Sequence, residues 1–175
     1  CECGPGGAGA RPARPFAGVP PGYLPVMSRN TRMLKCTPQD VFDVLADGWS
    51  YANWVVGAAR IRDVDPEWPA VGSKIHHSVG LWPLLISDNT EVDHVDPPHQ
   101  LRLKVRLWPT GSGIVTMTCA ATAGGTEVTM EEQLVSGPAS LLPRPVKDAM
   151  LHARNVEALN RLAYLAENRE RKQHS

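Results

Sequence analysis

The stretch "TEVTMEEQLV", residues 126–135, alternates like a β-strand with one apolar face and one polar face. Val128, Met130 and Leu134 share the apolar face, and Glu132 falls in step with them. Burying an ionised carboxylate costs free energy unless the group is paired or hydrogen-bonded. Either this strand leaves the core before Glu132, or the space beside it is a cavity instead of a packed core.

Alternation of this kind recurs along most of the chain, in segments bounded by Gly, Pro, Asn and Asp. "AGGTE", residues 123–127, predicts the hairpin turn before the opening stretch, and "DPPHQ", residues 96–100, predicts another connection. Together with the opening stretch, the strand-like segments are residues 28–36, 57–64, 73–80, 84–95, 100–108 and 113–122.

The clearest of these strands is "LRLKVRL", residues 101–107, which places apolar residues at its odd positions. Arg102, Lys104 and Arg106 occupy the other face. This pattern is typical of a half-buried antiparallel strand. We interpret the three cations as a solvated face of the sheet. The alternative is a basic ligand-binding patch, which would need acidic or phosphate partners.

Three segments carry helical patterns. "TPQDVFDVLAD", residues 37–47, offers Thr37 as an N-cap and Pro38 at the first helical position. "WSYANWVV", residues 49–56, predicts a second short helix or a turn. From Pro145 to about Asn168 the apolar period becomes helical, so the last element is predicted to be one long helix.

The long helix carries polar residues where apolar ones are expected. On its apolar face His152 lies near the centre and Asn155 on the edge, with Leu159 among the apolar members. Arg154 falls on the opposite, polar face. Like the opening stretch, the helix therefore carries polar residues in phase with apolar ones, on the side expected to face the interior.

Composition excludes several classes of function. The chain of 175 residues fits one domain with a sizeable core. Its 18 basic residues balance 18 acidic ones, so no overall charge favours nucleic acid or an anionic membrane as a partner. No apolar run approaches the roughly 20 residues of a membrane-spanning helix, so no transmembrane segment is expected.

The four cysteines, at positions 1, 3, 36 and 119, do not form a metal-binding pattern. "CEC" lacks the second ligand pair that a zinc site needs, so we predict no metal site and no cofactor. We also expect no disulfide framework and a reduced, cytoplasmic location.

Both ends of the chain differ in composition from the part between them. Residues 1–25 are mostly Gly, Pro, Ala and Arg, which predicts a disordered leader without the apolar region of a signal peptide. An alternative interpretation takes Met27 as the native start. We expect one domain over residues 26–168 and a solvated charged tail over residues 169–175.

At this point the sequence resembles a known family. The resemblance rests on "TPQDVFDVLADGWSYANW" (37–54), "DNTEVDHVDPPHQLRLKVR" (88–106), "GGTEVTMEEQLVSGP" (124–138) and "RNVEALNRLAYL" (154–165). These segments are similar to the START-like or SRPBCC superfamily, which includes birch-pollen-allergen-type and polyketide cyclase/dehydrase-like domains. The resemblance covers roughly residues 28–167.

This resemblance implies an α+β helix-grip fold. In that fold a bent seven-stranded antiparallel sheet wraps around a long C-terminal helix, and two short helices follow the first strand. It also implies a hydrophobic cavity that binds lipids, polyketides or other apolar small molecules. A cavity of the usual ligand range, roughly 300 to 1,000 Å³, is expected.

In such a fold, polar residues in phase with apolar ones would line the cavity. The candidates are His77, His94, Met130, Glu132, His152, Asn155 and Leu159. For Glu132 the alternatives are exposure where the strand frays or a pair with Arg144. For each histidine the alternative is a structural or exposed position. The five tryptophans are interpreted as core and rim packing instead of a ligand cage.

Two functions remain open. The favoured one is binding or carriage of an apolar small molecule, with oligomeric state left open. The alternative is an enzyme of the polyketide cyclase or dehydratase kind that uses a cavity Glu or His as general acid or base. No catalytic residue can be assigned from the sequence, and nucleophilic hydrolysis is not favoured because no G-x-S-x-G motif occurs.

Overall fold

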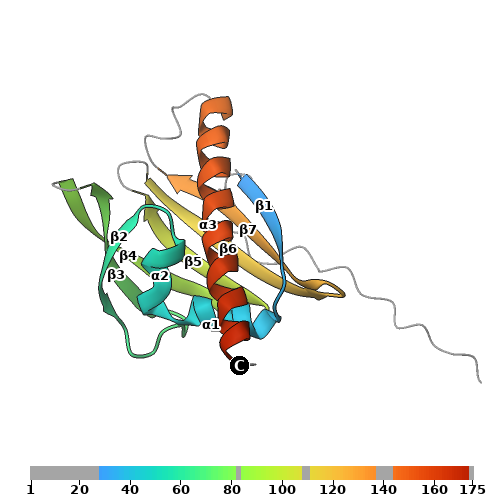
Figure 1. Ribbon diagram of the computed structural model, residues 1–175. Helices are drawn as coiled ribbons and strands as arrows, with labels where there is room; N and C mark the ends of the chain where they lie inside the picture. Colours follow the sequence, from blue (N-terminus) through green and yellow to red (C-terminus); the bar gives the residue numbers. More distant parts are fainter. Residues whose placement is uncertain (1–27, 82–83, 108–110, 137–143, 174–175) are drawn as a thin grey trace, which may run out of the picture.

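The computed structural model describes residues 28–81, 84–107, 111–136 and 144–173 (Figure 1). The predicted order of one strand, two short helices, six strands and one long helix is confirmed. The elements are β1 Ser28–Leu34, α1 Pro38–Ala46, a 3₁₀ turn η1 Gly48–Ser50, α2 Tyr51–Trp54, β2 Ala58–Val64, β3 Lys74–Leu81, β4 Leu84–Asp96, β5 Gln100–Leu107, β6 Gly111–Thr122, β7 Gly125–Ser136 and α3 Arg144–Gln173.

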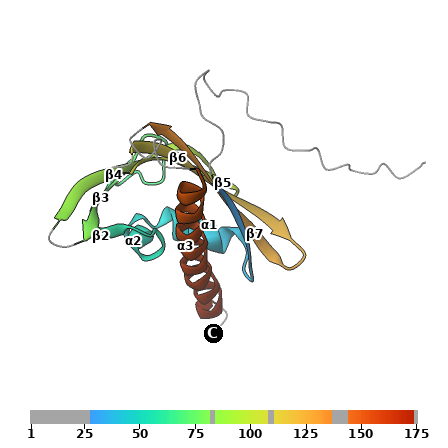
Figure 2. The same cartoon turned by 90° about the horizontal axis from the view of Figure 1, so that it is seen from above.

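The seven strands form one antiparallel sheet in the order β1-β7-β6-β5-β4-β3-β2. Six strands follow one another as hairpins, and β1 closes the sheet beside β7. Seen from above, the sheet curves around α3 (Figure 2). The helix-grip fold is therefore confirmed, and the core lies between the concave face of the sheet and the helices.

Helix α3 does not cover the sheet evenly. Its main contacts are with β1, α1 and α2, and a smaller contact is with β7. Figure 1 shows α3 crossing in front of the sheet, with α1 near its C-terminal end and α2 beside it over the β2–β5 side. Over the middle strands β3 to β5, helix backbone packs less closely on the sheet than it does over β1. Side chains of α2, α3 and these strands therefore fill the interior there.

Helix α1 begins where the sequence predicts. The Asp40 backbone N–H donates to Thr37 Oγ1 at 3.2 Å, and the Thr37 N–H donates to Asp40 Oδ2 at 2.9 Å, which completes a capping box. Pro38 occupies the start of the helix, as predicted. Val41, Phe42 and other apolar residues of α1 are then buried in the core.

The predicted alternation of β5 is confirmed. Leu101, Leu103 and Val105 are buried. On the outer face, Arg102 pairs with Asp93, and Lys104 approaches Asp93 at 2.9 Å and Glu91 at 3.6 Å. These cations are thus largely neutralised by carboxylates of the neighbouring strand, which supports a solvated face of the sheet over a basic ligand-binding patch.

Helix α3 ends later than the sequence predicts, because it continues past Asn168 to Gln173. Arg169 Nη1 lies 3.9 Å from Asp47 Oδ2, which brings this turn against the end of α1. Charged side chains are good helix formers, and the preceding helix supplies the nucleus. The leader, residues 1–25, lies outside the described residues.

The turn between β6 and β7 provides a test of the sheet's closure. Gly125 has φ +127°, and a Cβ there would lie 2.0 Å from the Leu34 carbonyl oxygen at the end of β1. We predict that Gly125→Ala lowers the free energy of unfolding by about 2 kcal/mol or more. The melting temperature should then fall by roughly 4 to 8 °C.

Gly124→Ala is the matched control, because a Cβ at Gly124 would meet no atom within 4 Å. It should change stability by no more than about 0.5 kcal/mol. Equal melting temperatures for the two variants would show that the contact between Gly125 and Leu34 is not tight.

Candidate functional site

A cavity of about 70 Å³ lies between the helices and the middle of the sheet. Its wall is mostly apolar, with Tyr51, Trp54, His77, Thr90 and Arg154 among its polar members. The remaining wall residues are Val55, Val56, Gly57, Ala58, Val79, Leu103, Val105, Arg106, Val115, Met130, Asn155 and Ala158. Gly57 and Arg106 are exposed, so the mouth lies between the α2–β2 connection and the end of β5.

The cavity is smaller than predicted. At about 70 Å³ it falls well below the roughly 300 Å³ at the lower end of the usual ligand range. Tyr51 and Trp54 of α2, which both line the cavity, are buried and pack edge to face, with ring centroids 5.4 Å apart.

One wall carries a chain of three hydrogen-bonding side chains from three elements. Thr90 Oγ1 on β4 lies 3.0 Å from Tyr51 Oη on α2 and 3.0 Å from His77 Nε2 on β3. The Tyr51 and His77 rings also contact, with centroids 5.5 Å apart. All three residues are buried, so this chain forms the polar end of the cavity.

Burial sets the protonation of this chain. It raises the pKa of Tyr51 to about 12, although the hydrogen bond with Thr90 acts in the opposite direction. Burial likewise lowers the pKa of His77, while the nearby Asp88 carboxylate opposes that change. At neutral pH both rings are therefore uncharged, and His77 can accept a proton.

Among the residues that the structure describes, three buried polar atoms have no hydrogen-bond partner: Trp54 Nε1, His77 Nδ1 and Asp88 Oδ2. Buried polar groups are normally satisfied, and each exception calls for an explanation. Trp54 and His77 both line the cavity. Two ring nitrogens of the wall are thus available to a molecule inside the cavity.

Glu132, the residue that breaks the pattern of the opening stretch, is fully buried. Both of its carboxylate oxygens accept hydrogen bonds from Arg154 Nη2 on α3. Asn155 Nδ2 donates to Glu132 Oε2 at 3.1 Å. The carboxylate is therefore inside the protein but paired, which is the condition that makes its burial tolerable.

The same side chains connect α3 to the edge strand β1. Asn155 Nδ2 lies 3.4 Å from Ser28 Oγ, and Asn30 Nδ2 lies 3.0 Å from His152 Nδ1. Glu132 and Ser28 are directly opposite each other in the β1–β7 pair. We call Glu132, Arg154 and Asn155 the clasp, because these three residues bind the helix to β7 and, through Ser28, to β1.

The structure brings four of the seven predicted residues to the cavity region. His77, Met130 and Asn155 line the wall, and Glu132 lies behind it in contact with Asn155. Leu159 is buried in the core and does not contribute to the wall.

Two histidines were placed wrongly by the sequence pattern. His94 is exposed, because an irregularity in the β4–β5 register after Val92 places it opposite Arg102 on the outer face. His152 is exposed as well, and it meets Asn30 of the edge strand instead of the cavity. Helix α3 leans toward β1, so the predicted centre of its apolar face is displaced.

Sequence reasoning missed Arg154, as it missed Tyr51, Trp54 and Thr90 of the cavity wall. Helical phase assigned Arg154 to the polar face, yet its side chain lines the cavity and is only 28 % exposed. Its long apolar stem lets the guanidinium reach around the helix. An isolated carboxylate in an apolar phase was the signal for a cationic partner. Arg144, the predicted cation, has a side chain outside the described part of the structure.

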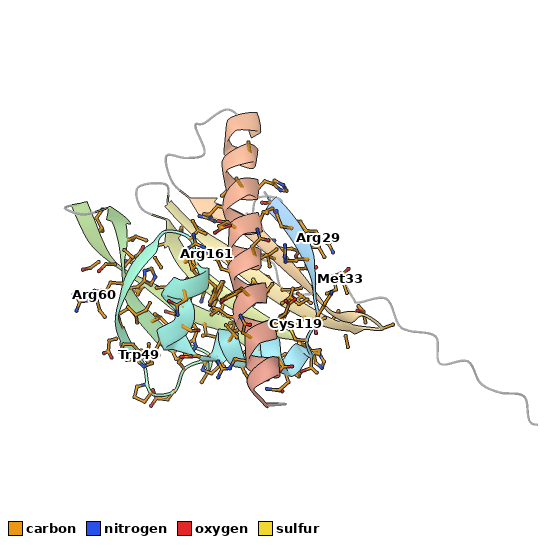
Figure 3. The ribbon with its side chains drawn as sticks, viewed as in Figure 1. Arg29, Met33, Trp49, Arg60, Cys119 and Arg161 are labelled. Carbon is orange, nitrogen blue, oxygen red and sulfur yellow. The ribbon has the colours of Figure 1, made fainter. Side chains whose placement is uncertain are left out.

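The remaining chemistry-bearing residues in the described segments do not form a second cluster. Burial raises the pKa of the Cys119 thiol to about 12, so this residue, labelled on β6 in Figure 3, is a poor nucleophile. Within the described residues no group of three His, Cys, Asp or Glu side chains could hold a metal ion. Trp49 is 61 % exposed (Figure 3), whereas Trp54 is the tryptophan of the cavity wall.

Removing Arg154 from the clasp should cost more stability than removing the charge of Glu132. Arg154→Met leaves the fully buried carboxylate of Glu132 without its cation, so we expect a loss of about 3 to 5 kcal/mol. Glu132→Gln keeps the shape, and the partly exposed Arg154 can turn to water, so its loss should be smaller, about 1 to 3 kcal/mol. Chemical denaturation measures both.

The exposed pair Arg161–Glu157 on the same helix supplies the control. Glu157→Gln should change the free energy of unfolding by less than about 0.5 kcal/mol. If Arg154→Met loses no more free energy of unfolding than this control, the buried Glu132 carboxylate does not depend on Arg154.

Comparisons with solved structures agree with this fold. Protein NE0264 from Nitrosomonas europaea is 15 % identical and has a TM-score of 0.63, covering 82 % of this chain and 95 % of its own. Protein CV1439 from Chromobacterium violaceum is 18 % identical with a TM-score of 0.60, covering 80 % and 96 %. At these identities the likeness establishes the fold alone.

A third similar structure is the di-domain ARO/CYC protein StfQ from the steffimycin biosynthetic pathway. It is 12 % identical with a TM-score of 0.66, and the match covers 82 % of this chain but 51 % of StfQ. No curated protein matches the chain significantly. The model of the family described as polyketide cyclase / dehydrase and lipid transport matches residues 26–167. The chain therefore belongs to the polyketide cyclase / dehydrase and lipid transport family.

Proposed function

We propose that the protein binds an apolar small molecule that carries one polar group. The supporting observation is a mostly apolar cavity whose wall includes Trp54 and His77, two residues whose ring atoms Nε1 and Nδ1 are buried without a partner in the described part of the chain. Small-molecule sites are mostly apolar concavities with a few placed polar groups. A ligand whose polar group reaches these nitrogens would satisfy them, while its apolar part covers Val79, Leu103 and Met130.

The volume of the cavity limits how much of a ligand can be enclosed. The enclosed space of about 70 Å³ takes only part of a molecule of the usual ligand range. The rest of the ligand must extend through the mouth, or the α2–β2 connection at residues 55–57 must move outward. This connection is short and half-exposed, so its displacement disturbs less packing than moving a strand would.

Nothing in the described residues points to a membrane-embedded form of this function. No described helix is long and apolar enough to cross a bilayer. The family description covers both lipid transport and polyketide chemistry, and the cavity wall is compatible with either class of ligand.

Filling the cavity tests the proposal. Ala158 on α3 is buried and lines the wall, so Ala158→Leu places three more carbons in the enclosed space. We predict that 2-naphthol binds the native protein saturably at one site and that Ala158→Leu weakens its binding at least tenfold, about 1.4 kcal/mol. Fluorescence titration measures the affinity.

Ala153→Leu is the matched control, because Ala153 is an exposed position on the same helix and not part of the wall. It should leave the affinity within about twofold. Melting curves of both variants establish that each is folded, since overpacking a core costs about 1 to 3 kcal/mol. Equal affinities for the two folded variants would place the naphthol site elsewhere.

A second candidate function is a cyclisation or dehydration reaction with His77 as the proton acceptor. The observation that favours it is the chain of hydrogen bonds through Thr90 to Tyr51, which links a neutral, buried imidazole to the cavity. General acid–base groups need this combination of reach and tuned pKa.

If this reaction exists, His77→Gln should lower kcat on a poly-β-ketone model substrate by about 10² to 10⁴. His76→Gln is the control, because His76 lies on the outer side, 3.5 Å from Asp65. In the native protein the rate should rise with pH through the pKa of His77, which burial places below the ordinary histidine value. A rate that is indifferent to His77→Gln removes this candidate and leaves the binding function standing.

A further inference from the structure

Arg106 differs from the other two cations of β5. Arg102 pairs with Asp93, and Lys104 pairs with both Asp93 and Glu91. Arg106 is exposed, and among the described residues its side chain makes no ion pair and no hydrogen bond. The chain has as many acidic as basic residues, so an unpaired cation does not follow from an excess of positive charge.

Arg106 borders two spaces. It lines the cavity, and it also lines a groove of about 240 Å³ that includes Glu91 and Lys104 of the outer face of the sheet. Arg106 is the last residue but one of β5, which ends at Leu107. Near the end of a strand one long side chain can reach either face, so an anion could approach Arg106 from the cavity or from the groove.

Charge distinguishes these two spaces. Among the described residues the cavity wall contains Arg106 and Arg154 but no carboxylate side chain, and Arg154 is already paired with Glu132 behind the wall. The groove contains Lys104 but also the carboxylate of Glu91. An anion beside Arg106 therefore meets less repulsion on the cavity side, where the lower dielectric also strengthens the attraction.

The polar end of the cavity is less suited to an anion. Asp88, the Cα partner of His77, is buried, and its Oδ2 has no hydrogen-bond partner among the described residues. Arg62 Nη2 lies 3.3 Å from the backbone oxygen of Asp88. Burial lowers the pKa of His77, and Asp88, which raises this pKa, acts on it more strongly than Arg62 does. The Tyr51–Thr90–His77 chain is therefore better matched to a neutral polar group.

We propose that Arg106 is a second recognition point for the ligand and binds a carboxylate on the part that extends through the mouth of the cavity. The enclosed space of about 70 Å³ is too small for a whole ligand of the usual size, so an outer part is required. The ligand class is an apolar acid with a neutral polar group inside the cavity. This inference rests on the proposed function, because the ligand must first occupy the cavity.

The spacing of the two recognition points suits a rigid bicyclic molecule. Thr90 and Val105 are Cα partners, and Val105 immediately precedes Arg106. The guanidinium group is thus separated from the polar chain by little more than the length of one arginine side chain. A matching probe is 6-hydroxy-2-naphthoate, which carries a hydroxyl group and a carboxylate at opposite ends of a naphthalene. Its methyl ester is the neutral counterpart.

Fluorescence titration with both probes at neutral pH tests the proposal. Ion pairs at exposed sites are weak, so we expect the native protein to bind the acid about fivefold more tightly than the ester at low salt. This preference should decrease as salt is added, because salt screens exposed charges. Arg106→Gln should reduce the preference to within about 1.5-fold, and Arg106→Lys, which keeps the charge, should retain part of it.

Arg60→Gln is the matched control. Arg60 lies on β2 (Figure 3), is exposed, and lines neither the cavity nor the groove. It should keep the native preference for the acid. Melting curves establish that the Arg60 and Arg106 variants are folded, and no loss of stability is expected because neither side chain has a partner among the described residues.

Ala158→Leu decides from which side the acid reaches Arg106. Because Ala158 lines the cavity and not the groove, this substitution should weaken binding of the acid by about tenfold or more, as for 2-naphthol. Unchanged binding of the acid by folded Ala158→Leu places the acid in the groove and overturns the proposal.

The proposal is also overturned if the native protein binds the acid and the ester equally, or if Arg106→Gln keeps the native preference. 2-Naphthol separates this inference from the proposed function. If 2-naphthol binds in the cavity but the acid is not preferred over its ester, the binding function stands and the role of Arg106 falls. If none of the three probes binds, the proposed function fails for these ligands and the role of Arg106 fails with it.

Discussion

The buried carboxylate of Glu132 is the constraint around which the rest of the interior is arranged. A carboxylate with no exposed surface is tolerable only with a close cation and further hydrogen bonds. Arg154 and Asn155 of α3 supply both, so one electrostatic requirement fixes the position of the long helix along β7. Ser28 extends the same contact to β1, which closes the sheet.

Fixing the helix at this edge has a consequence for the other half of the sheet. Helix α3 packs against β1, α1 and α2, and the space over the middle strands is filled by side chains of α2 instead. Tyr51 and Trp54 pack against each other there and line the small cavity. The clasp and the cavity are therefore two results of one arrangement, with Asn155 and Arg154 contributing to both.

The clasp and the cavity differ in whether their buried polar groups have hydrogen-bond partners. The clasp is satisfied within the protein, as expected for groups whose role is to hold elements together. At the cavity, Trp54 Nε1 and His77 Nδ1 are buried without partners among the described residues, and leaving buried polar atoms unpaired costs free energy. Because of this contrast we propose a structural role for Glu132, the most conspicuous residue of the sequence, and a ligand-binding role for the less conspicuous His77.

The sequence by itself determined the order of the elements, because hydrophobic period, the Thr37 cap and the turn at Gly124–Gly125 are local properties. For Glu132 it left open exposure where the strand frays, a pair with Arg144 and a position in a cavity wall. Only the tertiary structure decided that the partner of Glu132 is Arg154, that a register irregularity turns His94 outward, and that the cavity is small. These facts depend on contacts between distant segments, where a side chain several ångströms long or one extra strand residue overrides the simple phase of helix or strand.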